Sequence, residues 1–79
     1  MKVSFYEIRR RNIQFICTWE NPVCIPVKED TVVLELETDK SAIKRHYVVI
    51  DRIVSKDSVD IICEYDDCET IIPKPNNNE

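Results

Sequence analysis

The stretch over residues 44–66 constrains the fold most strongly, because it predicts its own strand pairing. With a turn at residues 55–58, Val54 pairs with Val59, and loops of two or four residues give the same register. The side chains that then share one face of an antiparallel hairpin are mostly apolar. They are Val48, Ile50, Val54, Val59, Ile61, Cys63 and Tyr65. The sequence therefore predicts a β-hairpin with a core side.

Alternating apolar side chains predict the remaining strands. Residues 2–10 place Val3 and Phe5 on one face and Tyr6 and Ile8 on the other, and residues 31–36 form another strand. A short edge strand is expected at residues 68–73. The strand over residues 13–19 has a polar side that only Ile16 interrupts. Its apolar side consists of Ile13, Phe15, Cys17 and Trp19.

Two connections break the strand pattern. Residues 20–26 contain Pro22 and Pro26, which lack an amide donor, so we expect a loop there. Residues 40–44 have helix-forming character, and Asp39 or Ser41 is placed to cap a single helical turn.

Size and composition limit the chain to one small domain. Of its 79 residues, 43% are apolar and 33% are charged, which is typical of a soluble domain with one thin core. We expect the domain to span residues 1–72 and residues 73–79 to form a flexible tail. Five or six short strands protect their edges by closing on themselves. The predicted fold class is therefore all-β, a small five- to six-stranded antiparallel barrel.

The chain contains no glycine. Left-handed turn positions must then fall to other residues, and Asn12, Asn21, Asp39 and Asp57 are the candidates. Phosphate-binding loops of the P-loop and dinucleotide type need glycine for close backbone approach. Nucleotide-dependent catalysis is therefore unsupported, and no cofactor is expected.

Charge and cysteine content predict the compartment. The net charge is −4, so the molecule as a whole repels polyanions. The N-terminal residues lack the apolar core of a signal peptide, and no stretch approaches the roughly 20 apolar residues of a membrane span. We expect a cytoplasmic protein with no membrane partner. Its four cysteines then read as reduced thiols, with zinc ligands and disulfides left as alternatives: Cys17, Cys24, Cys63 and Cys68.

Two short patterns carry a family resemblance. Residues 26–32 read Pro-Val-Lys-Glu-Asp-Thr-Val, and Tyr47-Val48-Val49 opens the strand that follows. The chain resembles the small SH3-like β-barrels of bacterial and phage proteins, whose pattern is Pro-x-x-Gly-Asp-x-Val followed by Tyr-x-Val. Glu29 stands at the glycine position, and the match covers about half of the chain. The resemblance implies an SH3-like barrel used for binding or assembly, without a catalytic set of residues.

The polar clusters predict no catalytic site. His46 is the only histidine and reads as a partly exposed strand residue, and no serine nucleophile stands in a recognisable setting. The acidic residues around Tyr65 read as a solvated edge. No metal site and no enzymatic activity are expected.

One basic cluster gives an alternative function. Arg9, Arg10 and Arg11 form a predicted hairpin tip, and Tyr6 lies close by in sequence. Arginines that contact phosphates beside a ring that stacks on a base are typical of small barrels that bind single-stranded nucleic acid. Nucleic acid is therefore possible, although the net charge makes it the less favoured partner.

The second face of the 44–66 hairpin supports the preferred function. It is predicted to carry Tyr47, Val49, Ile53 and Ile62 among acidic side chains. A bent barrel would absorb some of these apolar groups at its ends. An open sheet would instead leave them as an apolar patch with a charged rim, which is typical of a partner or oligomer surface. The sequence thus predicts a non-catalytic protein-interaction or assembly module, with a protein partner or self-association as the alternatives.

Overall fold

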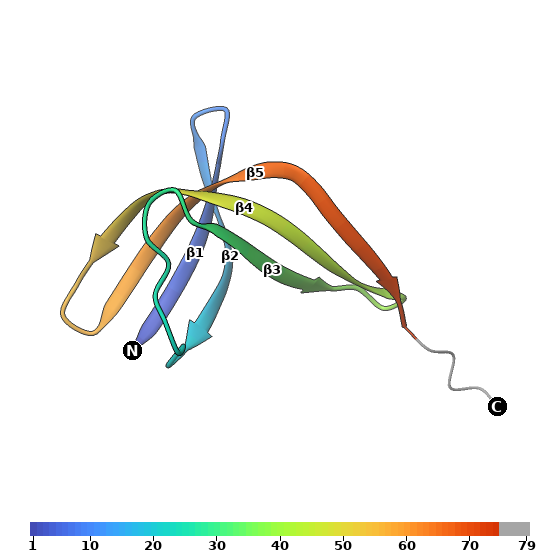
Figure 1. The fold of residues 1–79 in the computed structure, drawn as a ribbon, viewed down its shortest axis with the longest axis horizontal. Coiled ribbons are helices and arrows are strands. Elements are labelled where there is room, and N and C mark those ends of the chain that lie inside the picture. Colours follow the sequence, from blue (N-terminus) through green and yellow to red (C-terminus); the bar gives the residue numbers. More distant parts are fainter. Residues whose placement is uncertain (75–79) are drawn as a thin grey trace.

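The computed structural model describes residues 1–74, which form five strands in one mixed sheet (Figure 1). The strand order is β2-β1-β5-β4-β3, and every neighbouring pair is antiparallel except the parallel pair β1 and β5. The strands are β1 (Lys2–Arg9), β2 (Asn12–Glu20), β3 (Thr31–Glu37), β4 (Ser41–Val54) and β5 (Ser58–Pro73). The all-β class is confirmed. The expectation of an all-antiparallel sheet is wrong at β1 and β5, and the sheet is not closed, so a barrel is not confirmed.

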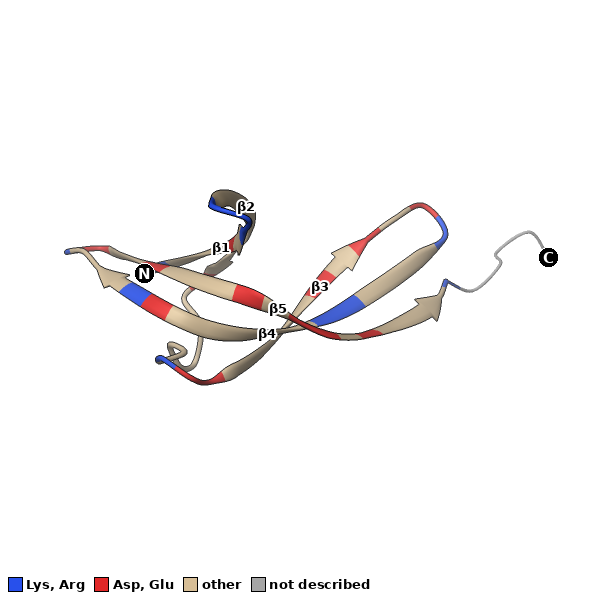
Figure 2. Cartoon of the chain, turned by 90° about the horizontal axis from the view of Figure 1, so that it is seen from above, with Lys and Arg blue, Asp and Glu red and all other residues tan. Residues whose placement is uncertain are grey.

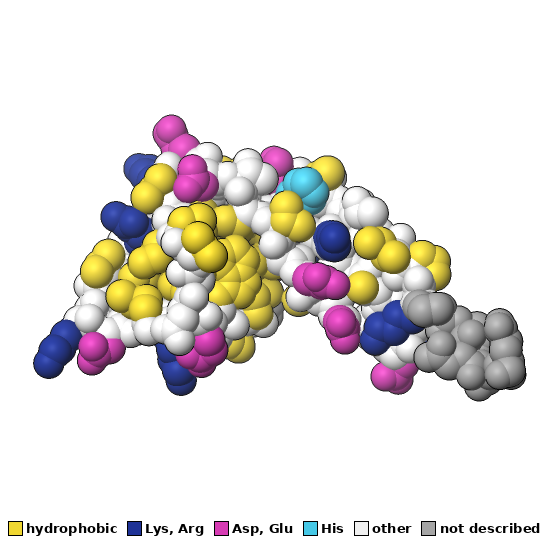
Figure 3. All heavy atoms as spheres, turned by 60° about the horizontal axis from the view of Figure 1, so that its bottom comes forward, with side chains coloured by type: hydrophobic (Ala, Val, Ile, Leu, Met, Phe, Trp, Pro, Cys, Tyr) yellow, Lys and Arg dark blue, Asp and Glu magenta, His cyan; other side chains and the backbone are white. Residues whose placement is uncertain are grey.

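The core lies on the inner face of this bent sheet. The parallel pairing aligns Val3 with Val59 and Phe5 with Ile61. These apolar pairs join the hairpin of β1 and β2 to the other three strands. The loop over residues 21–30 covers the core, with Ile25 packed on it. Seen from below, hydrophobic side chains gather in the half that holds β1, β2 and this loop (Figure 3). The buried residues of the hydrophobic core are Val3, Phe5, Val32, Leu34, Tyr47, Val49, Val59, Ile61 and Cys63.

A β-bulge at Ile50 changes the predicted hairpin. The pairs Val54 with Val59 and Arg52 with Ile61 are confirmed, but the register then shifts by one residue. As a result Cys63 pairs with Val49 instead of Ile50, and Tyr65 with Tyr47 instead of Val48. An unshifted strand would continue its core face through Val48 and His46, whereas the bulge places Val49 and Tyr47 there. A further register shift follows between Tyr47 and Arg45. The prediction that Val48 and Ile50 share the core face is therefore wrong.

A bulge at Ile16 divides β2 into two parts. Cys17 pairs with Phe5, but the next residue of β1, Tyr6, pairs with Phe15. The part from Cys17 to Trp19 keeps its apolar side chains toward the core, where the Trp19 ring lies 4.5 Å from that of Phe5. In residues 12–15 the two faces of the strand are exchanged, so the side chains of Ile13 and Phe15 point away from the core and are exposed. The prediction of one apolar face for residues 13–19 is wrong for this reason.

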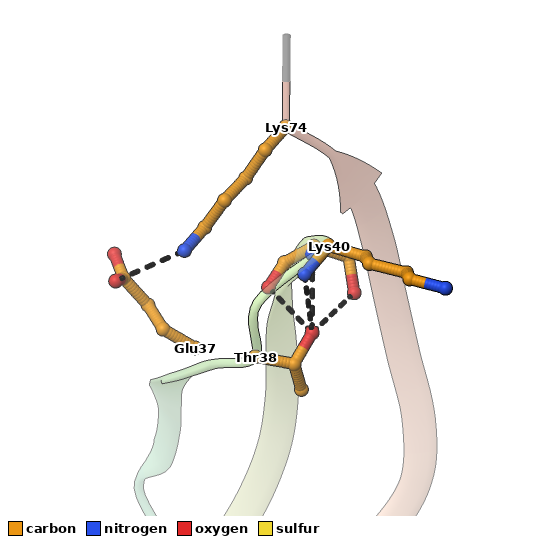
Figure 4. A network of polar contacts seen from close by, with 5 residues as sticks. Glu37, Thr38, Lys40 and Lys74 are labelled. Carbon is orange, nitrogen blue, oxygen red and sulfur yellow. Dashed lines mark hydrogen bonds and ion pairs between the residues drawn. The ribbon is translucent and has the colours of Figure 1, made fainter. Parts of the chain in front are cut away.

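The far ends of β3, β4 and β5 form an arm that extends beyond the core (Figure 1). Residues 41–44 are part of β4, so the predicted helical turn is wrong. The Thr38 hydroxyl accepts a hydrogen bond from the Ser41 amide at 3.1 Å and shapes the turn instead (Figure 4). Residues 68–73 belong to β5, and residues 69–73 pair with β4, so they are not a separate edge strand. The amide of Lys74 donates to the Lys40 carbonyl at 3.0 Å, whereas residues 75–79 of the predicted tail lie outside the described residues.

Five of the described residues adopt positive φ angles without being glycine. The prediction of left-handed residues is confirmed for Asn21 and wrong for Asn12, Asp39 and Asp57. Arg10 (48°) and Arg11 (72°) form the two-residue turn between β1 and β2, with the signs of a type I′ turn. The other two left-handed residues are Glu29 and Asp67. Left-handed geometry costs a non-glycine residue about 1–2 kcal/mol, so the turn of two arginines is strained.

We predict that Arg11→Gly raises the free energy of unfolding by about 1 kcal/mol, because glycine adopts this geometry without steric cost. Urea denaturation measures the change. The matched control is Arg52→Gly in β4, where φ is negative, and it should lower stability by about 0.5–1 kcal/mol. A loss of stability in Arg11→Gly would show that the Arg11 side chain contributes more than the strain costs.

The burial of Tyr47 gives a second prediction. Its side chain is 1% exposed, whereas that of Ile53 on the same strand is 51% exposed. Tyr47→Ala should lower the free energy of unfolding by about 3–5 kcal/mol, as removal of a buried aromatic ring does. Ile53→Ala should change it by less than about 1 kcal/mol. Similar losses for the two variants in urea denaturation would contradict the register beyond Ile50.

Candidate functional site

Five apolar side chains lie together on the outer face of the sheet, opposite the core. Across β2, β1 and β5, the register places Phe15 beside Tyr6 and Tyr6 beside Ile62, and it pairs Ile13 with Ile8. The Phe15 and Tyr6 rings meet edge to face, with centroids 5.7 Å apart. Phe15 is 60% exposed and Ile13 57% exposed, whereas the other three are half-buried. We call this set, Tyr6, Ile8, Ile13, Phe15 and Ile62, the outer patch.

The outer patch reaches a free strand edge. β2 has β1 on one side, and none of the described residues pairs with its other side. Edge strands are normally protected by charged residues, by proline or by bulges. Between Asn12 and Glu20, β2 has neither a charge nor a proline, and its bulge at Ile16 leaves residues 12–15 extended. This combination of free backbone groups and exposed apolar side chains is suited to pairing with another strand.

The structure corrects the partner surface that the sequence predicted. Tyr47 and Val49 are buried in the core, since the bulge at Ile50 turns them inward. They therefore share no exposed face with Ile53 and Ile62. Ile53 is exposed near the turn between β4 and β5, and Ile62 is half-buried within the outer patch. Sequence reasoning missed Phe15 as a surface residue, although Ile16, which interrupts the alternation of β2, marks the position of the bulge.

The predicted arginine cluster lies at the tip of the β1–β2 hairpin, which is basic in Figure 2. A hollow of about 410 Å³ lies below it, and Tyr65 rather than Tyr6 supplies its aromatic ring. Arg45 lies over that ring at 5.7 Å and donates a hydrogen bond to Glu69 at 2.7 Å, which raises the Arg45 pKa. Three acidic side chains and three arginines line the hollow, so its formal charges balance. Its lining comprises Glu7, Ile8, Arg9, Arg10, Arg45, Glu64, Tyr65 and Asp67.

The cysteines and the histidine do not converge on a common site. All four cysteines carry free thiols: Cys63 is buried, Cys17 half-buried, and Cys24 and Cys68 exposed. Within residues 1–74, no group of three or more His, Cys, Asp or Glu side chains is arranged to hold a metal ion. His46 is half-buried on β4.

Burial separates the chemistry of the thiols. Desolvation raises the pKa of Cys63 to about 12, and the charge of Glu7 adds to this shift. Burial also raises the pKa of Cys17. Only the thiolate form attacks alkylating reagents, so a raised pKa and restricted access both lower reactivity.

We predict that a thiol reagent modifies Cys24 and Cys68 rapidly in the folded chain, and Cys63 only when the chain unfolds. Mass spectrometry after timed alkylation, with and without denaturant, counts and locates the modified residues. Rapid modification of Cys63 without denaturant would contradict its place in the core.

The same pKa shift predicts a pH dependence of stability. An unfolded thiol ionises near pH 9.0, whereas folded Cys63 keeps its proton to about pH 12. The folded state then binds more protons over this interval, so the free energy of unfolding falls as pH rises from about 9 to 12. A Cys63→Ala variant should show a smaller fall than the wild type when urea denaturation is repeated across this pH range.

No protein-family model matches the chain, and neither a curated protein nor a solved structure is significantly similar to it. Among the described residues, there is no helix of the length and apolar character that crossing a membrane requires.

Proposed function

We propose that this protein is a non-catalytic protein-interaction or assembly module that binds its partner through the outer patch and the free edge of β2. The proposed mode is strand addition, in which backbone hydrogen bonds supply affinity and the apolar side chains supply specificity. The cytoplasm is the proposed compartment, supported by free thiols of the kind that a reducing compartment maintains.

The bulge at Ile16 is the observation that carries this proposal. Folding alone explains the bulge at Ile50, because that bulge brings Tyr47 into the core. The bulge at Ile16 has the opposite effect, since it turns Ile13 and Phe15 away from the core and into solvent. Burial of apolar surface stabilises a protein by about 25 cal/mol per Å², and burial of this exposed surface in a complex supplies that stabilisation on binding. Bulges that re-aim side chains are typical of functional positions.

The SH3-like relationship is also proposed, and the turn over residues 27–30 supports it. The Asp30 amide donates to the Val27 carbonyl at 3.0 Å, and Asp30 Oδ2 accepts a hydrogen bond from the Val27 amide at 2.9 Å. Glu29 has a φ of 76°, the left-handed geometry that the glycine of the Pro-x-x-Gly-Asp pattern would adopt. Glu29 thus adopts the turn geometry that a glycine at this position would adopt.

We predict that Phe15→Asp abolishes partner binding without unfolding the chain, because Phe15 is exposed and an aspartate would have to be desolvated at the interface. The matched control is Val23→Asp, which changes a fully exposed residue of the 21–30 loop. Quantitative capture from native host lysate, together with light scattering of the pure protein, measures hetero- and self-association. Wild type and Val23→Asp should bind alike.

Two results together would contradict the proposal. The wild type would capture no protein beyond those that Phe15→Asp captures, and light scattering of the wild type would give the mass of one chain. Circular dichroism and urea denaturation of the variant separate a loss of binding from a loss of folding.

Nucleic-acid binding is the second candidate, and the strained arginine turn favours it. Arg10 and Arg11 hold left-handed geometry at an energetic cost, and strained residues of this kind cluster at functional sites. Binding of a labelled single strand should then weaken steeply as salt rises, and Arg10→Ala with Arg11→Ala should reduce that dependence. The absence of binding at low salt would exclude this candidate.

A further inference from the structure

The start of the β2 edge and the end of the β3 edge lie next to charges of opposite sign. β2 begins directly after the turn of Arg10 and Arg11, whereas β3 ends with Glu35 and Glu37 (Figure 2). Arg11, Glu35 and Glu37 are all exposed. Glu37 lies 3.5 Å from Lys74, yet its side chain is still 67% exposed, so it can take part in a second ion pair.

We propose that the partner of the free β2 edge is a second copy of this chain, which supplies β3 in antiparallel orientation. This inference rests on the proposed function, and it names the occupant of the β2 edge. Opposite charges at the two edges are its main argument, since complementary charge fixes the orientation and register of an interface.

One register brings together an apolar pair and an ion pair, although it also places Glu35 opposite Ile13. Antiparallel pairing of Phe15 with Val33 of the second copy brings together two exposed apolar residues, of which Val33 is 44% exposed. The same register places Asn12, the first residue of β2, opposite Leu36, and brings Arg11 of the preceding turn to the position facing Glu37. Side-chain faces also agree, because Phe15 and Val33 both belong to the outer face of their sheets. A parallel arrangement would instead bring the Glu20 end of β2 to the Glu37 end of β3, where like charges repel.

Within one chain, the free edges of β2 and β3 do not pair with each other. An open hollow of about 200 Å³ is lined by residues of both edges, Gln14, Phe15 and Ile16 of β2 and Leu36 of β3, and the sheet does not close across it. Because β2 and β3 are different surfaces, their pairing is head to tail. Such an interface produces a ring where the rotation closes and a filament where it does not.

The test is a charge exchange between the two edges. Arg11→Glu places two glutamates opposite each other, and Glu37→Arg places two arginines opposite each other. Each variant alone should bind itself about 10-fold more weakly than the wild type, since like charges directly opposite destabilise paired strands. An equimolar mixture should regain wild-type assembly, because every interface that joins one variant to the other pairs a glutamate with an arginine.

Analytical ultracentrifugation over a concentration series measures the two variants and their mixture. Arg52→Glu on β4 is the control, since it makes the same charge change as Arg11→Glu away from both free edges. It should assemble as the wild type does.

The remaining outcomes overturn the inference. A wild type that has the mass of one chain at high concentration contradicts it, even where Phe15-dependent capture of another protein upholds the proposed function. If Arg11→Glu weakens assembly and Glu37→Arg does not, the interface joins β2 to β2 instead. Assembly of both single variants at wild-type affinity contradicts the proposed register, and circular dichroism establishes that each variant is folded.

Discussion

The alternation of side chains across a β-strand is the constraint on which this structure depends. Shifting a strand by one residue exchanges all of its inward and outward side chains, so each inserted residue decides what is buried beyond it. In β4, the bulge at Ile50 decides which side chains are buried. It gives Tyr47 and Val49 to the core and sends His46 and Val48 to the other face, which makes one apolar surface out of a strand whose simple alternation would not provide one.

The insertion at Ile16 follows the same geometry with a different result. It leaves Trp19 and Cys17 on the core but turns Phe15 outward, where its ring packs against the edge of Tyr6. The molecule therefore gives up apolar burial at a place where β2 also lacks a neighbour. A free edge, an exposed ring and an unprotected backbone at one position are the properties of a binding surface, and this is why we place the function there.

Sequence reasoning predicted the parts of the fold that depend on local alternation. The hairpin near residues 55–58, the faces of β1 and the strand around Val32 and Leu34 are all confirmed. It failed where a single residue interrupts a strand, because a bulge is chosen by packing across the whole sheet rather than by the strand itself. The parallel pairing of β1 with β5 was missed for a similar reason: nothing in either strand alone indicates its neighbour.

The prediction of the partner surface was wrong because a bulge interrupts β4. Ile62 lies in the outer patch, while Tyr47 and Val49 became core residues beyond the bulge at Ile50. The central claim is that Phe15 faces outward beside Tyr6, and nuclear Overhauser contacts in solution test it most directly. This account predicts contacts between the Phe15 and Tyr6 rings and a backbone pairing of Phe15 with Tyr6. A backbone pairing of Phe15 with Glu7, as an unbroken strand would give, would contradict it.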